Sequence, residues 1–531
     1  MLVALVAFAV VTALNLLWWW WPNRPVEISG WTDAPLQSVS FAPYRPGQSP
    51  LTRTFPTPDQ IDQDLKRLQG KVRSVRTYSA GENLEAVPQR AGKYGLKVWH
   101  GAWLNDNDKE NLEQVNLLID HANRYPDTIE RVIVGNEVLL RKDLTANQLR
   151  GYIRRVKSRV KQPVTYADVW EFWLRYREVA EDVDFVTAHF LPYWEDVPPR
   201  AEDAAAHVDG IRKQVVAAFP GKEILIGETG WPSHGRMRDG ALASRVNQAR
   251  FISQILERAR QDNFRVNFFE AYDEPWKRRW EGTVGGYWGL FDGAERKLKY
   301  PAGVAISNYP FWKLQMACGL FLCICVFAVA LFAPKHRPSP PAAASWVAVA
   351  MSATIGGILL GVSADKMLHE SYGLGGWLVQ GFLLAAAVTA PLLSTYALMS
   401  GRGLPSFLEV LGPPKGLTPL FMANMLGITL IVTTLIAAQT ALSLIFDARW
   451  RDFPFAALTM AVVPFWTLAF LNGSKSGERP LSEAVFAGLF AMAAVYIVFN
   501  EGFENWQAMW TGAVYLLLGS ALWRARTAAV A

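Results

Sequence analysis

The spacing of apolar and polar residues divides the chain into an apolar start, a long mixed segment and an apolar second half. Charged residues crowd the stretch from about Arg24 to Lys313, and the runs before and after it hold almost none. A helix that crosses a membrane needs about 20 mostly apolar residues. The pattern therefore predicts a polar domain between one amino-terminal span and a carboxy-terminal group of spans.

Eight segments have the length and apolar character of spans. The first runs from Leu2 to about Trp20 and lacks the basic start and small-x-small cleavage site of a signal peptide. We therefore expect a retained anchor over residues 1–22. The others form a membrane domain of about seven helices over residues 311–531, although Pro464 in one segment and the shortness of another leave a lower count open. These seven are Phe311–Phe332, Ala342–Gly361, Gly375–Met399, Leu420–Ile445, Phe455–Leu471, Ala484–Phe499 and Trp506–Trp523.

The charges of the connecting loops predict an orientation. With the amino terminus in the cytoplasm, the cytoplasmic loops hold Lys335, Arg337, Arg402, Lys415, Lys475, Arg479, Arg524 and Arg526. The opposite loops then hold only Lys366, Arg449 and Arg451. Cytoplasmic loops of membrane proteins carry the excess of positive residues. The polar domain, residues 30–310, is therefore predicted to lie outside the cytoplasm.

Within the polar domain, short apolar runs alternate with amphipathic segments. The apolar runs are Val39–Ala42, Val72–Tyr78, Leu96–Ala102, Arg131–Val134, Val164–Ala167, Phe185–His189, Glu223–Gly227 and Arg265–Phe269. Helical segments between them include Pro58–Leu68, Asn111–Arg124, Ala146–Lys161, Ala201–Phe219 and Leu242–Asp262. Strands that alternate with helices form parallel sheets, and eight repeats in about 250 residues suit a closed (β/α)8 TIM barrel. A doubly wound open sheet is the alternative, but no glycine-rich phosphate turn follows the first strand.

Two glutamates directly follow predicted strands. Glu137 lies in Val134-Gly135-Asn136-Glu137-Val138 after the fourth strand, and Glu228 lies in Gly227-Glu228-Thr229-Gly230-Trp231-Pro232-Ser233 after the seventh. Active sites of such barrels lie where the strands end. In glycoside cleavage one carboxyl group protonates the leaving oxygen, while the other attacks the anomeric carbon or positions water. Each glutamate alone could cap a helix or pair with an arginine, but two in matching settings favour catalysis.

Two further expectations follow from this pair. We expect burial and the anionic neighbour to raise the pKa of the acid. Asn136, beside Glu137, is a candidate donor to a sugar hydroxyl near the reacting carbon.

These two motifs resemble the signatures of glycoside hydrolase family 17, which comprises β-1,3-glucanases, licheninases and β-1,3-glucanosyltransferases. The resemblance covers about Phe41 to Tyr300. It implies a retaining barrel enzyme with Glu137 as acid/base and Glu228 as nucleophile. The eighth strand is similar to the family's segment in which an acidic residue and a lysine support the pair, which implies that role for Glu274 and Lys277.

Aromatic side chains at the predicted strand ends are candidates for sugar binding, because flat rings stack on the apolar face of a pyranose. They are Tyr44, Tyr78, Trp103, Trp170, Tyr193, Trp231 and Trp276. Core packing is the alternative for each of these rings. His189 is a candidate for binding a sugar hydroxyl, with a structural histidine as the alternative.

Composition excludes several other classes of function. All three cysteines, Cys318, Cys323 and Cys325, lie in one apolar run, so the polar domain has no disulfide framework or thiolate metal site. Its histidines lack metal-ligand spacing, and we expect neither a metal nor a cofactor. The net charge of +6 is modest and has a local explanation in the membrane half, so nucleic acid is not an expected partner.

The expected substrate is a β-glucan, and three functions stay open. The chain also resembles, more loosely, bacterial membrane-bound family members with a carboxy-terminal transmembrane region, which are similar to β-1,3-glucanosyltransferases tied to β-1,3/β-1,6-glucan synthesis. This resemblance implies a transferase at a bacterial inner membrane, with its barrel on the periplasmic side, in contact with lipid and with a glucan synthase as a candidate partner. The alternatives are an endo-β-1,3-glucanase and a non-catalytic glycan-binding or export subunit.

Overall fold

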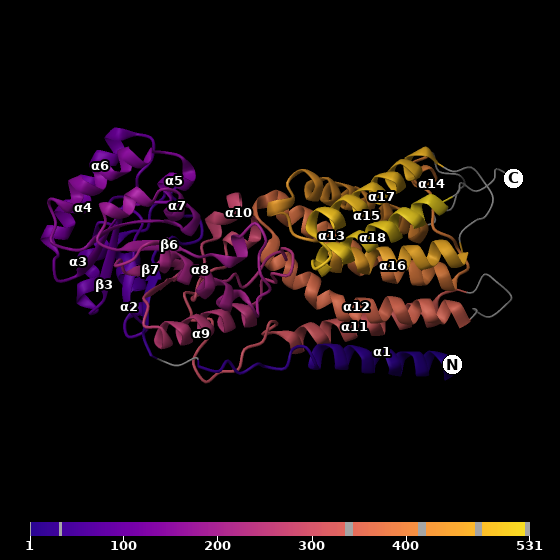
Figure 1. The fold of residues 1–531 in the computed structure, drawn as a ribbon. Helices are drawn as coiled ribbons and strands as arrows, with labels where there is room; N and C mark the ends of the chain where they lie inside the picture. Colours follow the sequence, from indigo (N-terminus) through magenta and orange to yellow (C-terminus); the bar gives the residue numbers. More distant parts are fainter. Residues whose placement is uncertain (1, 31–33, 335–342, 413–420, 473–479, 526–531) are drawn as a thin grey trace. The chain divides into compact units, whose positions relative to one another are not determined.

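A computed structural model describes residues 2–30, 34–334, 343–412, 421–472 and 480–525. The chain forms two units (Figure 1). One contains Val26–Ile306, and the other contains Met1–Pro25 together with Ser307–Ala531. The first unit is the polar domain of the sequence, and the second is built from the apolar segments.

Eight parallel strands of the first unit close into a barrel in chain order, with β1 paired to β8. The strands are β1 (Leu36–Ser40), β2 (Val72–Arg76), β3 (Lys97–Ala102), β4 (Ile129–Asn136), β5 (Val164–Val169), β6 (Val186–His189), β7 (Ile224–Thr229) and β8 (Val266–Phe268). The TIM barrel is therefore confirmed, and each predicted apolar run overlaps one strand. The closed order excludes the doubly wound alternative, which needs an open sheet.

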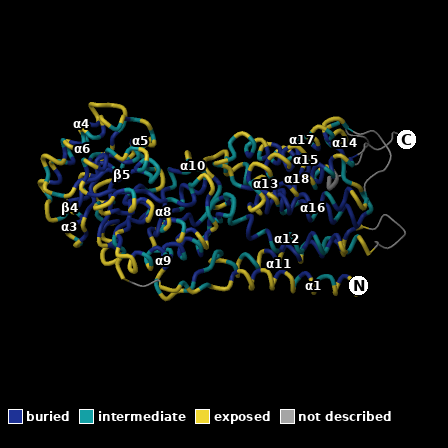
Figure 2. Tube along the Cα trace, viewed as in Figure 1, coloured by how far each residue is buried: buried dark blue, intermediate teal, exposed yellow. Residues whose placement is uncertain are grey.

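Helices surround the barrel and bury one apolar face each. They are α2 (Pro58–Leu68), α3 (Ala86–Lys93), α4 (Asp108–Arg124), α5 (Val138–Arg141), α6 (Ala146–Lys157), α7 (Trp170–Arg175), α8 (Ala204–Ala218), α9 (Arg245–Gln261) and α10 (Arg278–Gly285). Helix α2 begins where Thr57 and Gln60 form a reciprocal capping box, and it buries Ile61, Leu65 and Leu68. Figure 2 shows the same division, with buried residues along the strands and exposed residues on the outer helices.

Four of these helices, α3, α5, α7 and α10, were not among the predicted helical segments. All four are short, with 8, 4, 6 and 8 residues respectively. A helix of one or two turns presents too few apolar positions to show a 3.6-residue period.

The barrel interior is closed at its base by a small separate cluster. Its members are Trp99, Ile133, Ala167, Phe185 and Leu225. The buried guanidinium of Arg131 lies over the Phe185 ring at 4.7 Å, so its positive charge rests on an aromatic face. This plug leaves the opposite end, where the strands terminate, for polar side chains.

The second unit is a bundle of long helices. They are α1 (Leu2–Trp20), α11 (Trp312–Phe332), α12 (Ala343–Glu370), α13 (Gly373–Met399), α15 (Phe421–Phe446), α16 (Phe455–Asn472), α17 (Leu481–Glu501) and α18 (Trp506–Arg524), with the short α14 (Phe407–Leu411) between α13 and α15. Seven helices of the described residues are long and apolar enough to cross a membrane, which is compatible with a membrane protein. The expectation of eight is wrong by this criterion, because α18 is not among the seven. Its polar residues Gln507, Thr511 and Ser520 lower its mean hydropathy.

Two details correct the predicted loops of this unit. Lys366, assigned to a loop, lies in α12, which runs nine residues beyond the predicted end at Gly361. Lys335, Arg337, Lys415, Lys475, Arg479 and Arg526, which carry most of the orientation argument, lie outside the described residues.

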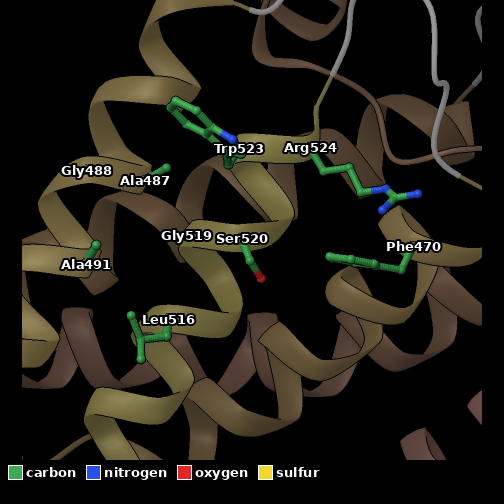
Figure 3. A pocket seen from close by; sticks show the side chains of 9 residues that line it. All are labelled: Phe470, Ala487, Gly488, Ala491, Leu516, Gly519, Ser520, Trp523 and Arg524. Carbon is green, nitrogen blue, oxygen red and sulfur yellow. The ribbon is translucent and has the colours of Figure 1, made fainter.

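A pocket of about 610 Å³ opens between α16, α17 and α18 (Figure 3). Its lining consists of Phe470, Ala487, Gly488, Ala491, Leu516, Gly519, Ser520, Trp523 and Arg524. None of these nine residues is a carboxylate, and most are small or apolar. The pocket therefore offers no acid–base pair, and the chemistry must be sought in the barrel.

Close contact between glycines joins the first helices of the bundle. A Cβ atom added at Gly319 of α11 would lie 2.0 Å from the carbonyl oxygen of Gly357 in α12. The buried Trp19 of α1 donates from its indole nitrogen to that same oxygen at 3.3 Å. The three helices therefore meet where Gly357 has no side chain.

We predict that Gly319→Ala destabilises the bundle by about 1–3 kcal/mol, because a methyl group there must push α12 away. Thermal unfolding of the protein in detergent micelles measures the effect as a lower midpoint. Gly488→Ala is the matched control, since a Cβ atom at Gly488 has nothing within 4 Å. Equal midpoints for the two variants would contradict the close contact.

Candidate active site

Glu137 and Glu228 lie at the carboxyl end of the barrel, as the strand ends predict. Glu228 is on β7 and is buried, while Glu137 follows β4 and keeps 24% of its side chain exposed. His189, the last residue of β6, contacts both. One carboxylate oxygen of each glutamate and a ring nitrogen of His189 all lie within 4.8 Å of one another. Three strands thus bring one compact acid–base group together.

Hydrogen bonds fix Glu228 from the side of β2. Arg76 Nη1 donates to Glu228 Oε1 at 2.9 Å, and Tyr78 donates its hydroxyl to the same oxygen at 2.8 Å. The guanidinium is 1% exposed and the carboxylate 5%, so the pair is shielded from water. A buried charge is tolerated only when it is paired and hydrogen-bonded, which holds for both partners here.

Arg76 also reaches the motif around Glu137. Its Nη2 donates to Asn136 Oδ1 at 2.5 Å. An amide oxygen only accepts hydrogen bonds, so the amide nitrogen of Asn136 is the group that can donate to a sugar hydroxyl. Arg76 was not predicted as a site residue, although its position as the last residue of β2, at the carboxyl end of the barrel, was the available signal.

The imidazole ring of His189 lies between Glu137 and Glu228 and contacts both carboxylates. Its Nδ1 lies 2.9 Å from Glu137 Oε1, and its Nε2 lies 3.3 Å from Arg76 Nη1 and 3.7 Å from Glu228 Oε1. The ring is fully buried. Both nitrogens therefore face protein partners, which corrects the expectation that His189 binds a sugar hydroxyl.

The pKa of Glu137 is lowered, whereas the sequence analysis expected it to be raised. Burial alone would raise it, but the hydrogen bond and charge of His189 and the nearby Arg141 and Arg76 act in the opposite direction and outweigh burial. The expectation was wrong because it counted the buried environment and the second carboxylate without the basic residues that β2, β6 and α5 bring there.

The acidic group after β8 also differs from the expected arrangement. Lys277 donates to Glu270 Oε2 at 2.5 Å, not to Glu274, whose carboxylate instead accepts from the indole of Trp276. Glu270 therefore takes the supporting position that the resemblance implied for Glu274. Its signal was its place immediately after the eighth apolar run, the same place that Glu228 has after the seventh.

Burial raises the pKa values of this group. It raises the pKa of Glu270 to about 7 against the opposing charge of Lys277. It also raises the pKa of Glu281 to about 7, and the charges of Glu137 and Glu228 add to that rise. Glu281 thus lies within electrostatic reach of both central carboxylates.

The donor types of Glu137, His189 and Glu228 could also hold a cation. However, Glu228 Oε1 already accepts from Tyr78 and from a guanidinium 2.9 Å away, and that positive charge opposes a metal ion at the same oxygen. The arrangement suits proton transfer and nucleophilic attack better than metal binding.

Comparisons with known proteins match the barrel. Residues 38–289 match the family model of the BtgE/BtgC glycoside hydrolase domain. The glucan 1,3-beta-glucosidase of Saccharomyces cerevisiae is 28% identical over 269 residues, which are 46% of this chain and 86% of that protein. The glucan 1,3-beta-glucosidase of Schizosaccharomyces pombe is 30% identical over 261 residues, 46% of this chain and 80% of that protein. This chain belongs to glycoside hydrolase family 17.

A solved family 17 structure is also similar. The β-1,3-glucanosyltransferase of Rhizomucor miehei is 26% identical, with a TM-score of 0.45, and the match covers 50% of this chain and 95% of that one. The family model and the two yeast relatives show that the barrel is the domain of a β-1,3-glucan-active, glycoside hydrolase-like enzyme. The relatives named here are fungal, so they give no support to a bacterial membrane, and the family model ends before the helical unit begins.

The aromatic residues expected to bind sugar in this family 17 barrel separate into two groups. Tyr193 and Trp231 are fully buried and pack edge to face at 5.8 Å, so neither ring offers a face to a sugar. Tyr44 is 4% exposed and packs against Trp276. Those three expectations are corrected to core packing. The rings that keep an exposed surface are those of Tyr78, Trp103, Trp170 and Trp276.

We predict that His189→Asn moves the basic limb of the pH profile of kcat/KM to higher pH. His189 lowers the pKa of Glu137, so removing it lets burial dominate and Glu137 stays protonated to a higher pH. The measurement is turnover of laminari-oligosaccharides between pH 4 and 9, with His207→Asn, a half-exposed histidine, as the control. A limb that stays in place or moves to lower pH would contradict the role of this hydrogen bond.

Proposed function

We propose that this enzyme is a retaining β-1,3-glucanosyltransferase that forms a covalent glucosyl-enzyme on Glu228. The observation that carries the proposal is the short separation of Glu137 and Glu228, with one oxygen of each within 4.8 Å. Carboxyl groups of retaining glycosidases lie about 5–5.5 Å apart, while those of inverting enzymes lie about 6.5–9.5 Å apart to admit a water molecule. An oxygen–oxygen separation below 4.8 Å favours the retaining arrangement.

The hydrogen bonds assign a role to each oxygen of Glu228. Arg76 and Tyr78 both donate to Oε1, and no contact to Oε2 is found among the described residues. Oε2 is therefore the oxygen that attacks the anomeric carbon. The two donors hold the carboxylate in one orientation, which lowers the entropic cost of reaching the transition state.

Glu137 moves the proton in both half-reactions. Its partly exposed carboxyl group protonates the leaving glycosidic oxygen as Glu228 forms the bond to the anomeric carbon. The resulting carboxylate, stabilised by His189, then removes the proton from the hydroxyl that attacks the glucosyl-enzyme. Its lowered pKa favours this second, base step and places the most active pH on the acidic side.

Transfer rather than hydrolysis is supported by the second unit of the chain. An enzyme fixed among seven long apolar helices is suited to remodel glucan at the membrane, where the expected acceptor is another glucan chain and a glucan synthase is the candidate partner. We place the barrel outside the cytoplasm on the loop charges of the sequence. Hydrolysis is the second candidate, favoured by the two yeast relatives, which are named glucan 1,3-beta-glucosidases.

We predict that the full-length protein in detergent converts reducing-end-labelled laminari-oligosaccharides into longer products. Glu228→Gln should lower turnover by more than about a thousand-fold, because it removes the nucleophile. Glu223→Gln, at the opposite end of the same strand, is the matched control and should keep its activity. Mass and linkage analysis of the products is the measurement. Exclusively shorter products would identify a hydrolase, and no turnover by the folded wild-type protein would leave a glycan-binding subunit.

We further predict that the first-formed product keeps the β configuration at the new anomeric centre. Two successive inversions, at formation and at breakdown of the glucosyl-enzyme, restore the original configuration. Proton NMR reads the anomeric signal of the new glycosidic bond, which does not mutarotate. If water is the acceptor, the spectrum must be taken within the first minutes, before the free anomeric centre mutarotates. An initial α signal would overturn the retaining mechanism while leaving the β-1,3-glucan substrate in place.

A further inference from the structure

We propose that Tyr166 and Asp168 form a positioning pair that holds Glu137 in the orientation required for proton transfer. The proposal rests on the proposed acid/base role of Glu137 and adds two residues of β5 to it. Being two residues apart on one strand, the pair projects from the same face of β5. Tyr166 is 1% exposed and Asp168 is fully buried, so neither meets substrate directly.

Glu137 has a backbone conformation that needs support. Its φ of 52° and ψ of 30° lie in the left-handed region. A residue with a side chain pays about 1–2 kcal/mol to adopt this conformation, and it persists only where its surroundings enforce it. The register of β4 against β5 shifts between Ile133 and Asn136, just before this point. The catalytic side chain therefore leaves the strand at an irregular, strained position.

The two side chains of β5 bind the backbone that follows Glu137. Helix α5 has only four residues, and the first amides of any helix have no partner within it. The amide of Leu139 donates to the Tyr166 hydroxyl at 3.0 Å, and the amide of Leu140 donates to Asp168 Oδ2 at 3.4 Å. Tyr166 and Asp168 thus hold the segment that directly follows Glu137 in the sequence.

Asp168 is itself fixed from both sides. Its Oδ2 accepts a hydrogen bond from the Tyr166 hydroxyl, and its Oδ1 accepts from the amide of Val169 at 2.8 Å. The amide of Glu137 donates to the carbonyl of Ala167, between the two residues, at 2.8 Å. Backbone and side chains of one short stretch of β5 therefore hold residues 137, 139 and 140 together.

The charge of Asp168 also acts on Glu137. Burial, with a smaller contribution from the charge of Glu137, raises the pKa of Asp168 to about 6. Because this coupling is reciprocal, an ionised Asp168 makes a proton on Glu137 more favourable and opposes the lowering caused by His189. The titratable groups that face Asp168 are Tyr166 on its own strand, Glu137 after β4, His189 on β6 and Glu171 on α7. The negative charge of Asp168 thus favours the protonated form of Glu137, which is the form that acts as an acid.

The test compares Asp168→Asn and Tyr166→Phe in the full-length protein on two kinds of substrate. With laminari-oligosaccharides, whose leaving oxygen needs a proton, kcat should fall about ten- to a hundredfold with KM changed less than about twofold. The second substrate is 2,4-dinitrophenyl β-laminaribioside, whose leaving group needs no proton. With it, the rate of glucosyl-enzyme formation, measured as the burst of dinitrophenolate, should fall by less than about threefold. Asp168→Asn should also move the basic limb of the kcat/KM profile to lower pH, because it removes a negative charge beside Glu137. This direction is opposite to that predicted for His189→Asn.

Asp184→Asn is the matched control. Asp184 also accepts a backbone amide of β5, that of Val164 at 2.7 Å, but at the opposite end of the strand. It should change neither the substrate ratio nor the pH limb. If Asp168→Asn fails to fold, Tyr166→Phe, which removes a single hydroxyl, carries the substrate comparison alone.

The outcomes separate this proposal from the function on which it rests. Equal losses on both substrates with an unmoved pH limb would overturn the positioning role while the wild-type protein remains an active transferase or hydrolase. No turnover by wild-type protein on either substrate would instead overturn the proposed function, and with it the acid/base role that the pair is inferred to support.

Discussion

The active site depends on one buried ion pair, that between Arg76 and Glu228. Removing two charges from water is expensive, and breaking such a pair by deleting one partner typically destabilises a protein by about 3–5 kcal/mol. Arg76 offsets this cost by binding more than its partner carboxylate. Its guanidinium also donates to the Gly227 carbonyl at 2.7 Å and to Asn136. A single side chain of β2 therefore fixes the ends of β4 and β7, which carry the two glutamates that we propose as catalytic.

The same ion pair makes the close approach of the two glutamates possible. Two ionised carboxylates this near would repel one another in a water-poor site. The guanidinium of Arg76 donates a hydrogen bond to Glu228, and the ring of His189 is hydrogen-bonded to Glu137. These contacts offset the repulsion between the two carboxylates. This is also why the pKa of Glu137 is lowered although the residue is largely enclosed. The balance of charges, rather than burial alone, decides which proton-transfer step the site favours.

The chain joins a family 17 barrel to a bundle of apolar helices, and the two units are stabilised in different ways. The barrel follows ordinary globular chemistry, with an aliphatic core and charges satisfied in pairs. The bundle relies on close backbone approach, as at Gly319 and Gly357. Small residues that allow such an approach are typical of helices that associate in membranes. The family model covers residues 38–289 and ends before the carboxy-terminal helices of the bundle begin.

Local sequence determined the strand and helix order of the barrel, the apolar helices and the positions of Glu137 and Glu228. Each of these follows from a short-range pattern: an apolar period, a capping residue or a glutamate directly after a strand. Tertiary structure alone decided which side chains meet. Arg76 and Tyr78 come from β2 and its end, His189 from β6 and Glu270 from the end of β8. Nothing in the spacing along the chain pairs Lys277 with Glu270 rather than Glu274. Likewise, Tyr193 and Trp231 match the composition of a sugar site but are buried, because the exposure of a ring depends on neighbours far away in sequence. The left-handed conformation of Glu137 has the same origin, since it is imposed by contacts with β5 rather than by any preference of glutamate.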